Sequence, residues 1–92
     1  MLVVRDNRTL MRFEMASGNA TAFVEYRREG DRIVLTHTEV PEALSRQGVG
    51  SKLVGGVLDA IRAEGATVIP ECEFVASFIQ RHPGYRSLLA EG

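Results

Sequence analysis

The chain has 92 residues, which suffices for one small domain, and we predict a single domain over residues 1–92. Its 11 basic and 12 acidic residues nearly balance, which argues against a general nucleic-acid or membrane-surface binder. One cysteine, Cys72, excludes an internal disulfide framework, and no apolar run approaches the length of a membrane span. The N-terminus lacks the pattern of a signal peptide, so we expect a cytoplasmic protein.

The part of the chain up to Val40 predicts strands joined by short turns. The expected strands are Leu2–Arg5, Leu10–Met15, Ala20–Arg27 and Arg32–Val40. Short turns between such strands indicate an antiparallel meander. In the longest strand, simple alternation places Ile33, Leu35, His37 and Glu39 on one face and Val34, Thr36, Thr38 and Val40 on the other.

The remainder of the chain predicts helices and one buried strand. Pro41 ends the fourth strand, and an apolar stripe at helical spacing predicts a helix over Gly48–Glu64. A short strand is expected at Thr67–Ile69 and a second helix at Glu73–Arg81, followed by a last helical turn near Arg86–Ala90. The order β-β-β-β-α-β-α predicts an α/β (α+β) fold with a mixed, mostly antiparallel sheet and a parallel β-α-β unit.

The segment Ser45–Ser51 lies between the fourth strand and the long helix. Gly48 and Gly50 allow the backbone to approach a ligand closely, because glycine has no Cβ. The first turn of the helix presents unpaired N–H groups and the positive end of the helix dipole. The sequence therefore predicts a binding site for a phosphate or pyrophosphate group here.

Three stretches around this loop carry a resemblance to a known family. They are His37–Leu44, Val68–Val75 and Arg81–Tyr85, together with the segment Ser45-Arg46-Gln47-Gly48-Val49-Gly50. The chain resembles the GNAT acetyltransferase superfamily, whose motif Q/R-x-x-G-x-G/A begins the cofactor helix; Ser45 stands at its first position here. It is similar in particular to small single-domain members labelled YidJ-like or N-acetyltransferase domain-containing.

The resemblance implies a donor, acetyl-CoA, and residues that hold it. Backbone contacts from Thr38 and Val40 would line one wall of a gap between the fourth and fifth strands. The loop residues Arg46, Gln47, Gly48, Val49, Gly50 and Ser51 would hold the pyrophosphate. No metal site is expected.

Three side chains are candidates for catalysis. Glu39, near the end of its strand, is a candidate general base, the alternative being a solvent-facing carboxylate. His37 has a pKa near neutral pH, but its apolar neighbours Ile33 and Leu35 favour a half-buried structural histidine. Cys72 is a candidate nucleophile or proton donor, or a buried core residue. Glu71 and Glu73, if close, are expected to raise the pKa of Cys72.

The expected function is acetyl transfer to an amine, either a small molecule or a protein group. A non-catalytic acyl-CoA-binding module and a protein-interaction domain stay open. They stay open because the tyrosine that larger members place in the last helix is replaced by Phe78, Ile79 and Gln80. We expect a monomer or a weak homodimer, with no nucleic-acid or membrane partner.

Overall fold

The computed structural model describes residues 3–90 of the chain. It contains five strands, three α-helices and one 3-10 helix. In chain order these are β1 (Arg5–Asn7), β2 (Arg12–Ser17), β3 (Ala20–Glu29), β4 (Arg32–Glu39), α1 (Glu42–Ser45), α2 (Val49–Glu64), β5 (Thr67–Pro70), α3 (Glu73–Arg81) and the 3-10 helix η1 (Pro83–Leu88).

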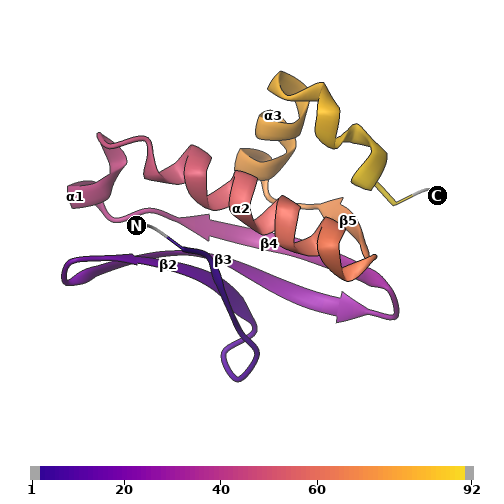
Figure 1. Cartoon of the computed structure of the whole chain (residues 1–92), viewed down its shortest axis with the longest axis horizontal. Coiled ribbons are helices and arrows are strands. Elements are labelled where there is room, and N and C mark those ends of the chain that lie inside the picture. Colours follow the sequence, from indigo (N-terminus) through magenta and orange to yellow (C-terminus); the bar gives the residue numbers. More distant parts are fainter. Residues whose placement is uncertain (1–2, 91–92) are drawn as a thin grey trace.

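The strands form one sheet in the order β1-β2-β3-β4-β5. The first three pairs are antiparallel, and β4 pairs with β5 in parallel through the crossover helix α2. The helices all lie on one side of the sheet (Figure 1). This arrangement confirms the predicted mixed, mostly antiparallel fold with its parallel β-α-β unit.

The core lies between α2 and the helix-facing side of the sheet. The apolar stripe of α2 is fully covered, through Val49, Leu53, Val54, Val57, Leu58 and Ile61. It packs against alternate residues of the strands, among them Phe13, Val24, Ile33 and Leu35. The opposite side of the sheet carries charged side chains such as Arg12, Glu25 and Arg27, so the molecule has two layers and one polar sheet face.

A β-bulge in β4 changes which side chains face the helices. Leu35 pairs with Tyr26, whereas His37 pairs with Glu25, so Thr36 is an extra residue in β4. Directly opposed residues of two strands share a face, and Thr38 is opposite the buried Val24. Thr38 therefore faces the helices. The prediction that His37 and Glu39 share a face with Ile33 and Leu35 is wrong, because alternation restarts after the bulge.

The first strand lies later in the chain than the sequence predicted. We expected Leu2–Arg5, of which Leu2 lies outside the described residues, but the strand is Arg5–Asn7. Asp6 accepts a hydrogen bond from Tyr26, and the side chain of Asn7 accepts one from the Leu10 amide. These contacts move the turn to Arg8–Met11, where Met11 has a φ of 54°.

Two short helices also differ from expectation. The sequence did not predict α1, in which the Pro41 carbonyl accepts the amides of Leu44 and Ser45 at 2.8 and 3.1 Å. The sequence predicted a last helical turn near Arg86–Ala90, but the 3-10 helix that follows the end of α3 at Arg81 spans Pro83–Leu88. Pro83 begins η1, because proline fits the first position of a helix.

Candidate functional site

The N-terminus of α2 presents backbone donors without a side-chain cap. Gly48 is its N-cap residue, in the left-handed conformation with a φ of 69°, which glycine adopts without strain. The first bond of the helix runs from the Lys52 amide to the Gly48 carbonyl at 3.2 Å. The amides of Val49, Gly50 and Ser51 precede it, have no partner within the helix, and can bind an anion.

No acidic side chain lies in the first turn of α2, where it would repel an anion. Arg46 and Lys52, on either side of the turn, have exposed side chains. Gln47 is also exposed, and its side-chain amide lies 3.5 Å from the carbonyl of Ala43 in α1. Val49 is buried and anchors the helix start in the core. The expected loop residues other than Val49 thus lie at the surface of this helix end.

The edge of β4 beyond Leu35 lies next to this helix end. Pairing with β5 stops at Leu35 and Pro70, where the Cys72 amide bonds to the Leu35 carbonyl at 2.9 Å and the chain turns into α3. Among the described residues, no strand pairs with Thr36–Glu39 on the side of β4 where β5 pairs with Arg32–Leu35.

The pairing pattern shows which backbone groups face this edge. The Tyr26 amide bonds to Met11 at 3.0 Å, so Tyr26 directs its backbone away from β4. Backbone groups alternate in direction along a strand, so Val24 also directs its N–H and C=O away from β4. Its partner Thr38 therefore directs its own N–H and C=O to the opposite edge of β4, which β5 does not cover beyond Leu35. Val40 follows β4 at the next position of this alternation, and its side chain packs against the core.

Cys72 lies across this edge from Thr38. Its sulfur is 3.3 Å from the Thr38 hydroxyl, and the residue is the N-cap of α3. Burial acts to raise the pKa of the Cys72 thiol. Hydrogen bonds from Thr38 and from the amides of Val75 and Phe74 outweigh burial and lower the pKa below its ordinary value. The expectation was that Glu71 and Glu73, if close, would raise this pKa, but the pKa of Cys72 is lowered, chiefly by the Thr38 side chain and then by the amides of Val75, Phe74 and Thr38.

His37 and Glu39 lie on the other face of β4. Their partners on β3 are Glu25 and Phe23, and the side chains of His37 and Glu39 are 55% and 60% exposed. The His37 Nε2 atom lies 3.8 Å from a Glu39 oxygen. The structure therefore pairs these two residues with each other and separates them from Cys72, and His37 is more exposed than a structural core histidine.

Phe74 is a residue of this region that the sequence did not single out. Phe74 lies in the first turn of α3 and is 41% exposed. A Cβ at Gly50 would lie 2.8 Å from the tip of its ring. Phe74 thus spans the distance between the α2 start and Cys72. Helical spacing does not predict that the Phe74 ring lies against Gly50, because the same spacing is met by an apolar residue in the core and by an exposed one.

Two classes of feature are absent from residues 3–90. No helix there combines the length and the apolar character that crossing a bilayer requires. The same residues hold no group of three His, Cys, Asp or Glu side chains able to bind a metal ion.

Comparisons with known proteins agree with this arrangement. A family model described as GCN5-related N-acetyl-transferase matches residues 12–88. The fold is also similar to the NMR solution structure of a GCN5-like putative N-acetyltransferase from Staphylococcus aureus, with a TM-score of 0.73 and 25% sequence identity. That match covers 97% of this chain and 88% of the other. The chain therefore belongs to the GCN5-related N-acetyltransferase family.

Proposed function

We propose that this protein binds acetyl-CoA between the start of α2 and the edge of β4, and that it transfers the acetyl group to an amine. The observation that supports the proposal most directly is the N-terminus of α2, which has Gly48 as its N-cap and no side-chain cap. The ring of Phe74, two residues after Cys72, lies next to Gly50 in this helix start. Family membership supports acetyl transfer as the reaction.

The residues present fit the two ends of this donor. The amides of Val49, Gly50 and Ser51 would bind the pyrophosphate, and the absence of a carboxylate in that turn keeps the local charge favourable. Arg46 and Lys52 are exposed cations beside it. The peptide groups of Thr38 and Val40 would bond to the amide-containing arm of the donor.

Bound acetyl-CoA supplies an acetyl thioester whose thiolate leaves when an amine attacks. In the direct route Glu39 accepts the proton of the attacking amine, either itself or through water. His37, 3.8 Å away, would be the nearest group to share that proton. The exposed position of both side chains gives an acceptor access to them.

The alternative route uses Cys72 as a nucleophile. Its thiolate would attack the acetyl carbon, form the new sulfur–carbon bond and release the CoA thiolate, which then takes up a proton. The amine would next attack the acetyl carbon of the Cys72 thioester, form the amide bond, lose a proton to water and release the Cys72 thiolate. The lowered pKa of Cys72 supports this route because it increases the thiolate fraction near neutral pH.

Further assignments extend the proposal. We assign the protein to the small YidJ-like members of the family, in the cytoplasm and as a monomer or weak homodimer. A non-catalytic acyl-CoA-binding module is the second candidate. It is favoured by α3, which carries the buried Phe78 and Ile79 where larger members carry a tyrosine acid.

Intact-protein mass spectrometry after incubation with acetyl-CoA tests these alternatives, with thermal shifts recorded in parallel. The proteins are the wild type and Cys72→Ala, each with and without an amine mixture. We expect acetyl-CoA to raise the melting temperature of both. An acetyl adduct that hydroxylamine removes, present on the wild type only, supports the cysteine route.

Other outcomes separate the remaining candidates. Stabilisation and acetylated amine without a protein adduct support the direct route through Glu39. Stabilisation with no acetylated amine supports the non-catalytic module. A melting temperature that acetyl-CoA leaves unchanged in the wild type contradicts the proposed function.

A further inference from the structure

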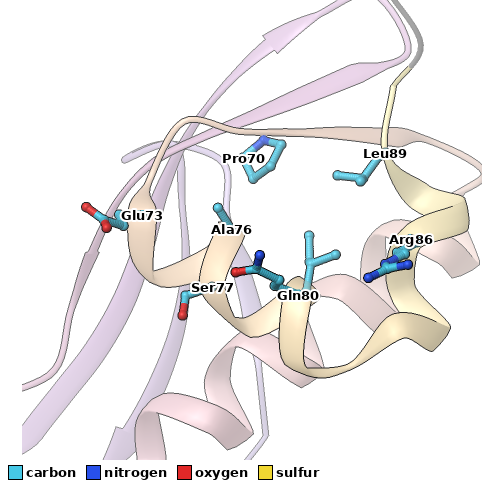
Figure 2. Close-up of a pocket in the computed structure, with 8 residues that line it drawn as sticks. Pro70, Glu73, Ala76, Ser77, Gln80, Arg86 and Leu89 are labelled. Atoms are coloured by element: carbon cyan, nitrogen blue, oxygen red, sulfur yellow. The ribbon is translucent and has the colours of Figure 1, made fainter.

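A pocket of about 460 Å³ lies on the side of α3 next to the edge strand β5. Its lining comes from β5, α3, η1 and the residue after η1: Pro70, Glu73, Ala76, Ser77, Ile79, Gln80, Arg86 and Leu89. Figure 2 shows Glu73 and Arg86 at opposite ends of it. The pocket shares no residue with the proposed donor site, and its volume suits a small ligand.

Its two charged side chains lie at opposite ends. Glu73, which follows Cys72 directly, lies at the end nearest the proposed reaction with its exposed carboxylate directed outward, and the guanidinium of Arg86 lies at the other end. The rest of the lining combines the apolar Pro70, Ala76, Ile79 and Leu89 with the polar Ser77 and Gln80. Among the described residues, the side chains of Glu73, Gln80 and Arg86 form no hydrogen bond or ion pair, so a ligand can bind them without breaking one.

The edge of β5 adds an acceptor at this pocket. The Val68 carbonyl accepts the Ala90 amide at 2.9 Å, so Val68 directs its backbone to the outer edge of the sheet. Alternation along the strand places the Pro70 carbonyl on the same edge, and proline has no N–H. The pocket near Cys72 therefore offers oxygen acceptors from Pro70 and Glu73, which suit an ammonium or amine group.

We infer that this pocket binds the acetyl acceptor, and that the acceptor carries an amine at one end and a carboxylate at the other. The carboxylate would pair with Arg86, whose planar guanidinium matches it. The part of the lining that belongs to α3 runs from Glu73 to Gln80, seven residues or about 10 Å on a helix. An extended tripeptide spans about the same distance, so a short peptide with small apolar side chains fits along α3 with its C-terminus toward Arg86, which lies beyond Gln80 (Figure 2). This inference rests on the proposed function.

The test compares trialanine with its C-terminal amide as acceptors, using acetyl-CoA as donor. For the wild type we expect kcat/KM to be about tenfold higher for the acid, because the amide loses one charge-assisted interaction. Arg86→Gln should remove this preference by lowering kcat/KM for the acid only. The matched control is Arg5→Gln, an exposed arginine on β1 at the opposite edge of the sheet, which should keep the preference.

A second readout does not depend on turnover. Trialanine added to ¹⁵N-labelled protein should shift the amides of Ala76, Ser77 and Gln80 in the wild type, and shift them less in Arg86→Gln. Equal rates for acid and amide, no acetylation of either peptide, or shifts confined to other residues would overturn the inference. In each of those cases, thermal stabilisation by acetyl-CoA would leave the donor part of the proposed function standing, whereas its absence would contradict that function itself.

Discussion

Cys72 and Thr38 form the closest side-chain contact in the proposed site. Thr38 faces Cys72 only because the bulge at Thr36 turns it toward the helices. The thiol donates to the Thr38 hydroxyl at 3.3 Å. In the thiolate form the hydroxyl and amide of Thr38, with two amides of the α3 start, donate to the sulfur, which lowers the pKa of Cys72. The reactivity of this thiol is therefore set by one strand irregularity and one helix end.

Replacing Thr38 with valine should raise the pKa of Cys72, because one donor to the thiolate is lost. At neutral pH the thiolate fraction then falls, and alkylation by iodoacetamide should slow by about fivefold, the effect of one hydrogen bond. Mass spectrometry at a series of pH values measures this rate. Thr36→Val is the control, since its hydroxyl bonds to the Glu25 carbonyl. An identical pH profile for the wild type and Thr38→Val would disprove this role.

Replacing Gly50 with alanine should weaken acetyl-CoA binding more than it weakens the fold. The new Cβ meets only the tip of the Phe74 ring, which can rotate away, and alanine favours a helix over glycine by about 1 kcal/mol. The methyl group and the displaced ring would then narrow the approach to the α2 amides. We expect a dissociation constant about tenfold higher by calorimetry, with a melting temperature near that of the wild type.

Gly55→Ala is the matched control for that experiment. Its Cβ would lie 3.6 Å from Phe78, an ordinary contact, on a helix face away from the proposed site. Its affinity for acetyl-CoA should match the wild type. Equal affinities for Gly50→Ala and the wild type would show that the donor does not approach Gly50.

The sequence predicts the position of some site residues and not the orientation of others. Gly48 and Gly50 were predictable, because a strand-to-helix junction with two glycines has a direct physical meaning. The faces of His37 and Glu39 were not, because a bulge without glycine leaves no mark on an alternating pattern. Phe74 was hidden because the same apolar residue type serves in the core and on the surface.

At the scale of elements, helices and strands with a long apolar pattern were the most predictable. The helix expected over Gly48–Glu64 begins at Val49 with Gly48 as its cap, and α3 has the predicted bounds. Of the short elements, β5 was predicted, whereas α1 was not and β1 was expected too early in the chain. The helix α1 has one buried residue, Leu44, and β1 is placed by the contact of Asp6 with the distant Tyr26 and by the local contact of Asn7 with the Leu10 amide.

Arg28 connects two of these elements. It forms ion pairs with Glu64 at the end of α2 and with Asp6 in β1. The bond from Arg28 lowers the pKa of Glu64 in the folded protein. A carboxylate whose pKa is lower in the folded than in the unfolded protein adds to the free energy of unfolding at any pH above the unfolded pKa, which is about 4.3 for glutamate. This contribution is lost as the pH falls through the pKa of the folded state.

Glu64→Gln should therefore destabilise the protein by about 1 kcal/mol at pH 7, and the difference from the wild type should shrink in acid. Urea unfolding at several pH values between neutral and about 3 measures it. Glu25→Gln is the control, since Glu25 is an exposed carboxylate with no ion pair among the described residues. A difference that stays constant down to the acid limit would show that the charge of Glu64 is not the cause.

At the scale of the whole molecule, one layer of helices covers one face of the sheet. The apolar strand and helix patterns are sufficient to predict this, because each element needs a covered apolar side. The proposed donor site and the proposed acceptor pocket then lie on opposite sides of α3, the first toward α2 and the second toward β5. Cys72 and Glu73, adjacent in the chain, connect them. A chain this short thus has room for both a donor and an acceptor.

The most direct test of the account is a titration of ¹⁵N-labelled protein with acetyl-CoA, followed by amide chemical shifts. We predict saturable shifts for Val49, Gly50 and Ser51 at the α2 start and for Thr38 on β4, with smaller effects elsewhere. These amides belong to two elements, α2 and β4. If all of them saturate with the same dissociation constant, one ligand contacts both elements. If the chemical shifts of all four amides stay unchanged at saturating acetyl-CoA, the account is contradicted.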